Sequence, residues 1–299
     1  MQNKVEPIES VRRWAEFVKL SHTIFALPFA LGSMVVASGP QHGWPGFRIF
    51  FLIVAAMICA RTCAMAFNRI VDRHFDAENP RTAARHLPTG AISLVSAWTL
   101  CLLSGAGLVA VSYYINWICF VLSPVAILVV CFYSLTKRFT DFTHVFLGIA
   151  LSLAPIGAWL AVRGTIGIQP VLLGLAVVCW LIGFDIIYAL QDYEFDRTHG
   201  LHSLVVRWGV QNSLGIAFFA HLAMWLLLTL FGLISGFRVT YFVGLVLILG
   251  SLVLEHWLAR RRGLNWIQVA FFRLNAFISV VFLVSTVIAV AFPGFRFKR

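Results

Sequence analysis

Nine apolar stretches of about 20 residues each constrain this chain more than any other feature. A stretch of this length spans the hydrocarbon core of a bilayer as one helix, with its backbone groups hydrogen-bonded internally. Over 299 residues the chain is 60% hydrophobic and 12% charged, which is too apolar for a soluble domain. We therefore predict an all-α, polytopic membrane protein: one domain over residues 1–299, a bundle of nine transmembrane helices. The predicted spans are residues 18–37, 47–67, 92–112, 117–135, 142–162, 170–190, 213–235, 239–258 and 274–292.

The basic residues predict how the chain is oriented. Of the 23 Lys and Arg, sixteen fall on one side of the predicted spans, in the N-terminal tail and in alternate loops. By the positive-inside rule this side faces the cytoplasm, so a bacterial cytoplasmic (inner) membrane with a cytoplasmic N-terminus is expected. The N-terminal segment has no apolar core of a signal peptide, so the first span is expected to act as its own insertion signal. The same distribution, in short clusters between apolar runs, argues against nucleic acid as the partner of this +11 chain.

Two acidic segments stand out at the ends of predicted spans. Residues 68–90 read NRIVDRHFDAENPRTAARHLPTG, and residues 185–203 read DIIYALQDYEFDRTHGLHS. Acidic residues concentrated at the ends of lipid-length helices indicate a functional site. The residues that repeat at intervals of four are Asn68, Asp72 and Asp76 in the first segment and Tyr188, Asp192 and Asp196 in the second.

On a helix, an interval of four residues places side chains along one stripe, so two facing stripes would form one acidic pocket. Carboxylates without His or Cys partners suit Mg²⁺, which commonly links carboxylates to the phosphates of a substrate. The pattern therefore indicates a diphosphate substrate. The alternative is that these are solvated loop acids, ion-paired with Arg69, Arg73, Arg81 and Arg197. That alternative explains one such segment better than two with matching spacing.

Cations near these segments extend the hypothesis. Lys137 and Arg138 follow the fourth predicted span and are either a topology anchor or groups that neutralise a leaving diphosphate. Arg61 precedes Asn68 by seven residues, about two turns deeper along the same helix face. A buried Arg needs an anion, which is either Asp185 or a carboxylate on the substrate.

These segments together resemble the UbiA superfamily of intramembrane polyprenyltransferases. The resemblance rests on Arg61, on the segment from Asn68 to Gly90, on YSLTKRFT at 133–140, and on the segment from Asp185 to Ser203. It is similar to the branch of 4-hydroxybenzoate polyprenyltransferases and to its relatives that prenylate a dihydroxynaphthoate in a menaquinone route. Members of the family are bundles of nine transmembrane helices with a lateral opening for the prenyl chain.

By position, the resemblance implies a set of roles. Metal binding is expected for Asn68, Asp72, Asp76, Asp192 and Asp196, of which the four Asp are also the expected catalytic residues. Diphosphate binding is expected for Arg81, Arg85, Lys137 and Arg138, and acceptor binding for Arg61, Asp185 and Tyr188. The chain departs from the family pattern at Arg69, where many members have Asp, and at His86, where the usual residue is Pro. The first departure removes one possible metal ligand, and both favour the naphthoate-type relatives slightly.

The expected activity is Mg²⁺-dependent transfer of a polyprenyl group from polyprenyl diphosphate to the ring of an aromatic hydroxy acid, in ubiquinone or menaquinone biosynthesis. The acceptor is expected to be of the 4-hydroxybenzoate type, with 1,4-dihydroxy-6-naphthoate as the alternative. Besides these substrates and the lipid bilayer, no obligate protein partner is expected. A secondary transporter is the alternative of another class, with Asp185 and Arg61 as its coupling or substrate sites. Against it, most of the acids lie at helix ends and in loops, away from the membrane midplane.

Overall fold

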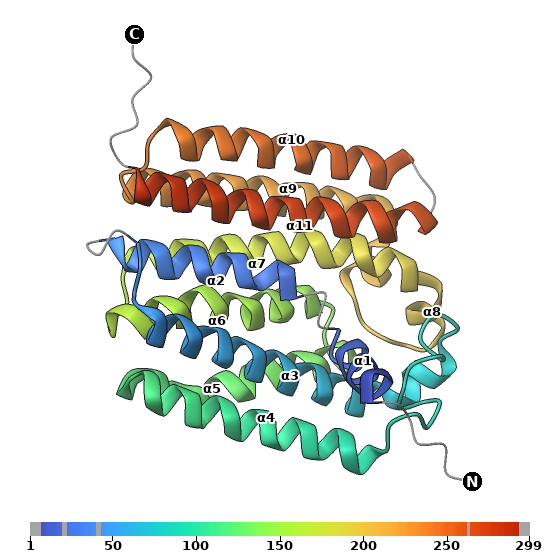
Figure 1. Cartoon of the computed structure of the whole chain (residues 1–299). Helices are drawn as coiled ribbons and strands as arrows, with labels where there is room; N and C mark the ends of the chain where they lie inside the picture. Colours follow the sequence, from blue (N-terminus) through green and yellow to red (C-terminus); the bar gives the residue numbers. More distant parts are fainter. Residues whose placement is uncertain (1–6, 20–22, 40–42, 262–263, 293–299) are drawn as a thin grey trace.

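The computed structural model describes residues 7–19, 23–39, 43–261 and 264–292. These residues form helices and no strand, so the predicted all-α class is confirmed. Figure 1 shows the long helices packed side by side in one bundle. The helices are α1 (Pro7–Phe17), α2 (Thr23–Ala37), α3 (Phe47–Glu78), α4 (Leu94–Ile115), α5 (Trp117–Phe132), η3 (Tyr133–Arg138), α6 (Thr143–Arg163), α7 (Ile168–Ala189), η4 (Leu190–Asp192), α8 (Tyr193–Thr198), α9 (Leu204–Ile234), α10 (Val239–Arg261) and α11 (Leu264–Ala291).

Eight of the described helices are long and apolar enough to cross a membrane, and the shorter α2 supplies the ninth predicted span. Each predicted span therefore corresponds to a described helix, which confirms the predicted bundle. The number of transmembrane helices reaches nine only when the shorter α2 is included. The helix of the first predicted span, α2, begins at Thr23; residues 18 and 19 of that span lie in a turn after α1, and residues 20–22 lie outside the described residues.

α3 and α9 both extend well beyond their predicted bounds toward the same end of the bundle. α3 continues eleven residues past Phe67 to Glu78, so the first acidic segment begins on a helix and not in a loop. It stops where Asn79 precedes Pro80, because the residue before a proline is disfavoured in the helical conformation. α9 begins at Leu204, nine residues before its predicted start, and is interrupted at Gly209, whose φ of 76° suits glycine.

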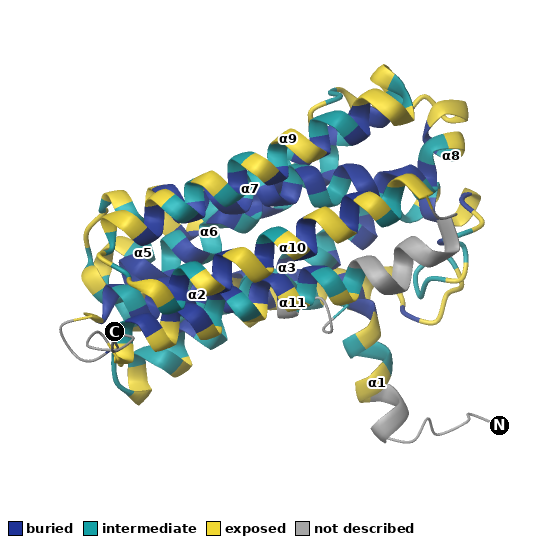
Figure 2. Ribbon diagram, turned by 90° about the horizontal axis from the view of Figure 1, so that it is seen from above, coloured by how far each residue is buried: buried dark blue, intermediate teal, exposed yellow. Residues whose placement is uncertain are grey.

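α7 is the central helix of the bundle. It packs between α9 and α6, and its residues Leu173 and Trp180 are completely buried. The large buried side chains around them come from α2 and the three C-terminal helices, as the dark interior of Figure 2 shows. α1 stands apart from this packing and contacts the loop after α3, through Phe17 against the ring of His86.

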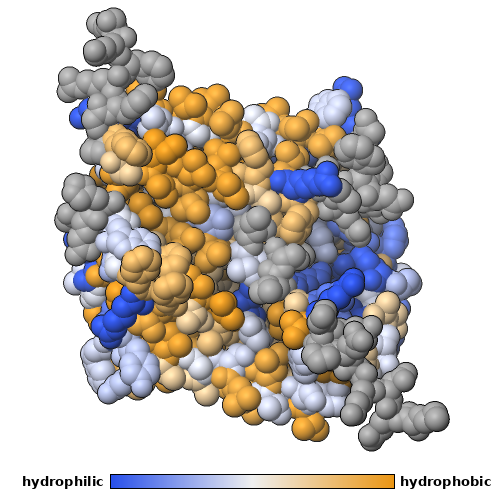
Figure 3. All heavy atoms as spheres, viewed as in Figure 1, coloured by the Kyte–Doolittle hydropathy of each residue, from blue (hydrophilic) through white to orange (hydrophobic). Residues whose placement is uncertain are grey.

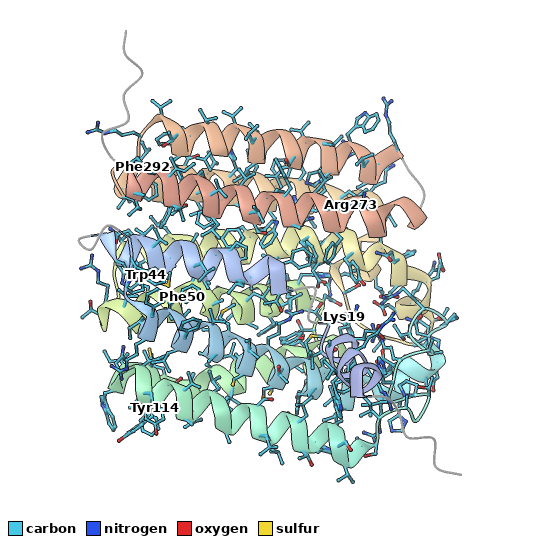
Figure 4. All side chains as sticks on the ribbon, in the orientation of Figure 1. Lys19, Trp44, Phe50, Tyr114, Arg273 and Phe292 are labelled. Atoms are coloured by element: carbon cyan, nitrogen blue, oxygen red, sulfur yellow. The ribbon has the colours of Figure 1, made fainter. Side chains whose placement is uncertain are left out.

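The outer surface of the bundle matches a membrane. Figure 3 shows apolar residues over most of the visible helical surface, with hydrophilic residues gathered at one end. Aromatic residues occupy the opposite end, where Trp44 and Tyr114 lie in Figure 4, as expected for a membrane–water interface. Lys19 lies toward the hydrophilic end of the bundle.

Close approach of α7 and α9 depends on Gly183. A Cβ at this position would lie 2.3 Å from the ring of His221 and 2.9 Å from the carbonyl oxygen of Ala217, so neither neighbour leaves room for it. We expect Gly183→Ala to lower the free energy of unfolding by about 1–3 kcal/mol through overpacking. Thermal unfolding in detergent measures the effect. Gly215→Ala on α9 is the control, because no atom lies within 4 Å of its added Cβ; equal melting temperatures for the two variants would contradict this packing.

Candidate active site

A polar pocket lies at the hydrophilic end of the bundle, with a volume of about 290 Å³. Its walls come from the end of α3, the loop that follows it, η3, α6, and the segment from α7 to α8. All twelve side chains that the sequence predicted for the site line this one pocket, although their sequence positions span more than 130 residues. The twelve are Arg61, Asn68, Asp72, Asp76, Arg81, Arg85, Lys137, Arg138, Asp185, Tyr188, Asp192 and Asp196.

Each of the four motif aspartates in this pocket is paired with a different cation. The partners are the four cations that the sequence predicted for diphosphate binding. The pairs and their nitrogen–oxygen distances are Arg138–Asp72 (3.3 Å), Arg85–Asp76 (2.6 Å), Arg81–Asp192 (2.7 Å) and Lys137–Asp196 (3.3 Å). Arg81 holds Asp192 through two of its nitrogens, as the planar guanidinium allows.

These pairs correct the expectation of an acidic pocket. The pocket is lined by seven Lys and Arg side chains and five carboxylates, so its formal charge is +2. The sequence also allowed the alternative that the acids are ion-paired with nearby arginines. That alternative is right for Arg81, which pairs with Asp192, and for Arg69, which lies 4.0 Å from Asp76. Neither Arg73 nor Arg197 is in an ion pair among the described residues.

The two motifs differ in backbone structure. In the first, Asn68 and Asp72 lie one turn apart on α3, and the Asn68 amide donates to the Asp72 carboxylate at 2.8 Å. The second was expected to form one helical stripe, but it is divided between α7, η4 and α8. Tyr188 lies near the end of α7, whereas Asp192 ends the short 3-10 turn. The tighter turn changes the direction of the chain at Asp192, so the three side chains do not follow a single helix face.

The loop after α3 contributes a residue that the sequence interpretation missed. The Asn79 amide nitrogen donates to Asp192 at 3.2 Å, and its amide oxygen accepts from the backbone N–H of Arg81 at 2.9 Å. Asn79 thereby positions Arg81 beside the acid that both of them contact. The Asn-Pro pair in the sequence was a signal for a turn at this point, since Asn side chains commonly stabilise such turns.

Asp185 and Arg61 are not partners, which excludes the pairing considered from the sequence. Arg61 donates to the backbone carbonyl of Lys19 at 3.1 Å and has no carboxylate within 4.0 Å among the described residues. Asp185 is instead bound by Nδ1 of His144 at 2.6 Å. Lys19 and His144 were both missed, because their roles depend on helix packing and carry no spacing signal in the sequence.

The donor atoms of the pocket suit Mg²⁺. They are carboxylate and amide oxygens, and Oδ2 of Asp76 is buried without a hydrogen-bond partner among the described residues. Within the described part of the chain, no three His, Cys, Asp or Glu side chains converge as a complete metal cage. Mg²⁺ does not require one, since it usually takes one or two protein carboxylates together with water and substrate phosphates.

An apolar cavity of about 290 Å³ adjoins the polar pocket and shares Arg61, Met65 and Tyr133 with it. Its remaining walls are almost entirely hydrophobic and come from α2 to α6. From Met65 to Ile53 along α3 it extends over twelve residues, or about 18 Å. The two cavities together suit a molecule with an anionic head and a long apolar chain.

Fold and site together define a polytopic helical membrane protein with an ion-paired pocket at the mouth of an apolar cavity. Residues 26–281 match the model of the UbiA prenyltransferase family. The chain is 30% identical over 260 residues to a 4-hydroxybenzoate octaprenyltransferase of Francisella tularensis subsp. novicida, covering 86% of this chain and 89% of the relative. It is 31% identical over 220 residues to the enzyme of the same name from Tolumonas auensis, covering 74% and 77%.

Solved structures agree with this result. The apo structure of a UbiA homolog from Aeropyrum pernix K1 superimposes with a TM-score of 0.80 at 29% identity, covering 89% of this chain and 96% of that one. A UbiA homolog from Archaeoglobus fulgidus, bound to DMAPP and Mg²⁺, has the same fold with a TM-score of 0.70 at 19% identity, covering 93% and 99%. The chain belongs to the UbiA prenyltransferase family, as the resemblance of its motifs predicted, and is a prenyltransferase.

Lys19 gives the pocket a titratable cation near neutral pH. Burial of its ammonium group, together with repulsion from Arg69, Arg85, Arg81 and Arg61, lowers the pKa of Lys19 from 10.5 to about 7. We expect reductive methylation of Lys19 to accelerate up to about pH 7 and then level off, because a neutral amine is the reactive form. Mass spectrometry of the modified peptide measures the rate. A rate that keeps rising tenfold per pH unit to about pH 9 would show an ordinary lysine.

Proposed function

We propose that the protein transfers a polyprenyl group from polyprenyl diphosphate to the ring of an aromatic hydroxy acid of the 4-hydroxybenzoate type, with Mg²⁺, in ubiquinone or menaquinone biosynthesis. One observation carries the proposal: four Asp–cation pairs line a pocket that continues into a long apolar cavity. The names of the curated relatives support the acceptor class, and DMAPP and Mg²⁺ in the Archaeoglobus homolog support the donor and the metal.

The ion pairs supply both halves of a site for a metal–diphosphate complex. Arg81, Arg85, Lys137 and Arg138 can exchange a carboxylate partner for a phosphate oxygen, which leaves the aspartate oxygens available for the metal. Asn68 and the four motif aspartates would then hold Mg²⁺, whose charge stabilises the departing diphosphate. The cations of the pocket add to that stabilisation because they are held in place near the leaving group.

The apolar cavity accounts for the second property of the donor. A prenyl chain placed along α3 would occupy space that is lined by residues such as Ile53, Leu108 and Ala154, away from water. Its allylic carbon would then lie near Tyr133 and Met65, where the two cavities meet. Exclusion of water from this position protects an allylic cation against hydrolysis.

The acceptor would be bound by the pocket residues that have no role in binding the diphosphate or the metal. Arg61 lies where both cavities meet and has no carboxylate partner among the described residues, so it is available for the carboxylate of an aromatic acid. Tyr188 and Asp185 line the polar pocket from α7 and would face the hydroxyl side of the ring. By the positive-inside rule, the N-terminus and the whole pocket would face the cytoplasm.

The direct test is incubation of membranes containing the protein with radiolabelled polyprenyl diphosphate and single aromatic acids. Transfer to 4-hydroxybenzoate is the expected result. Transfer only to 1,4-dihydroxy-6-naphthoate would move the protein to the menaquinone alternative with the same chemistry. Transfer to no aromatic hydroxy acid, in membranes where the protein is inserted and binds the donor, would overturn the proposal.

We expect transfer to stop when EDTA removes divalent cations, because aspartates that give up their cation partners to the diphosphate are then left beside it with no metal to balance them. Asp72→Asn and Asp192→Asn should each lower the rate by roughly 10²-fold or more, the effect expected when one group that stabilises the transition state is lost. Asp141→Asn is the control, since Asp141 pairs with Arg207 outside the pocket. Near-normal rates in either pocket variant, or in EDTA, would show that the metal site is assigned wrongly.

Arg61 is expected to determine recognition of the acceptor and not of the donor. Arg61→Lys should raise the acceptor KM by roughly tenfold or more, because a charge-assisted hydrogen bond contributes about 1.5–3 kcal/mol and Lys cannot form the planar fork of Arg. The donor KM should change little. Arg163→Lys is the control. Arg163 is the last residue of α6, whose first residue lines the polar pocket, and it lies outside both cavities. An effect confined to the donor KM would contradict the assignment.

A further inference from the structure

Asp185 differs from the other carboxylates of the pocket in its partner. The four motif aspartates are each bound by Lys or Arg, whereas Asp185 is within 4.0 Å of no Lys or Arg among the described residues. Its partner is His144 on α6, whose Nδ1 lies 2.6 Å from Oδ2 of Asp185. The Asp185 side chain is 22% exposed and lines the pocket, so its carboxylate can reach a bound substrate.

His144 is not explained by packing alone. Its side chain is completely buried, and its Nε2 has no hydrogen-bond partner among the described residues. Buried polar atoms are almost always hydrogen-bonded, so an imidazole that leaves one nitrogen unpaired while the other binds a carboxylate calls for a functional reason. Because a carboxylate only accepts hydrogen bonds, Nδ1 carries the proton and donates it to Asp185.

We propose that Asp185 is the general base that deprotonates the phenolic hydroxyl of the acceptor, and that His144 is the positioning residue that holds its carboxylate ready. This inference rests on the proposed function and adds a role for His144 that the motifs do not contain. A carboxylate held by Arg or Lys is engaged by that cation, because a neighbouring cation favours its ionised form. Among the described residues, Asp185 is the pocket carboxylate that no Lys or Arg holds within 4.0 Å, so its partly exposed carboxylate is free to accept a hydrogen bond from the acceptor hydroxyl.

The proton and the electrons balance as follows. Asp185 takes the proton of the phenolic O–H, which gives a phenolate with a more nucleophilic ring. The allylic C–O bond breaks with its electron pair remaining on the diphosphate, and the ring carbon ortho to the oxygen forms the new C–C bond. The resulting dienone loses its ring proton to solvent while its oxygen recovers a proton from Asp185. One proton is released overall, and the aspartate is regenerated.

Other titratable groups lie near Asp185 in the pocket. Lys137 on η3 acts on it electrostatically, His144 on α6 binds it directly, and Tyr188 lies one turn further along the same helix. The test therefore compares two acceptors at one pH, so that titration of these neighbours affects both measurements equally.

Asp185→Asn should lower the rate of transfer to 4-hydroxybenzoate by roughly 10²–10³-fold, as expected for loss of a general base. With 3-fluoro-4-hydroxybenzoate, whose phenol is more acidic, the loss should shrink by roughly tenfold or more, because less of the barrier depends on the base. An equal loss on both acceptors would overturn the proposal.

His144 is tested by two variants that differ in one hydrogen bond. His144→Leu should lower kcat roughly tenfold with little change in either KM, and the fluorinated acceptor should relieve the loss. His144→Gln, whose amide N–H can still donate to Asp185, should recover most of kcat. Equal activities of the two variants would overturn the positioning role, and an unchanged donor KM shows that the variants are folded.

Failure of this proposal can be told apart from failure of the proposed function. If the wild type transfers a prenyl group to an aromatic acid and Asp185→Asn transfers it equally fast, only the assignment of the base is wrong. If the wild type transfers to no aromatic acid while still releasing diphosphate, the proposed acceptor class is wrong and the role of Asp185 falls with it.

Discussion

The ion pairs between the four motif aspartates and four cations are the interaction on which the rest of the site depends. Removing one member of a buried pair leaves an uncompensated charge, which costs about 3–5 kcal/mol, so each charge in this pocket constrains its partner. Pairs such as Arg85–Asp76 balance the charges of the pocket in the absence of a ligand. In a prenyltransferase they also place cations and carboxylates side by side, so that a metal–diphosphate complex can be bound by exchanging partners.

The fold serves these pairs by extending helices beyond the length that a membrane requires. α3 carries its apolar residues through the bundle and then presents Asp72 and Asp76 on the turns that follow. From the other side of the pocket, α7 ends in a 3-10 turn that presents Asp192. Because the apolar cavity begins at the base of the same pocket, the charged and lipid-like parts of one substrate can be bound together.

Much of this could be predicted from the sequence because its signals are local. Apolar runs of membrane length gave every long helix, and the intervals of four residues identified Asp72, Asp76, Asp192 and Asp196 as members of one site. What the sequence did not predict depends on contacts between distant segments. His144 is 41 residues from Asp185, and neither it nor Lys19 belongs to a periodic pattern. The break between α7 and α8 was also missed, since periodicity does not distinguish a 3-10 turn from a continuing helix.

The central claim is that the pocket is complete only when a divalent cation joins the diphosphate to the aspartates. Calorimetric titration of the purified protein with farnesyl thiodiphosphate, which resists ionisation, tests this claim without requiring turnover or an acceptor. The account predicts tight binding in Mg²⁺ and binding weakened by roughly tenfold or more in EDTA, because the aspartates that lose their cation partners to the diphosphate then repel it with no metal between them. Equal affinity in the two conditions would show that the cations alone hold the diphosphate, and would contradict the account.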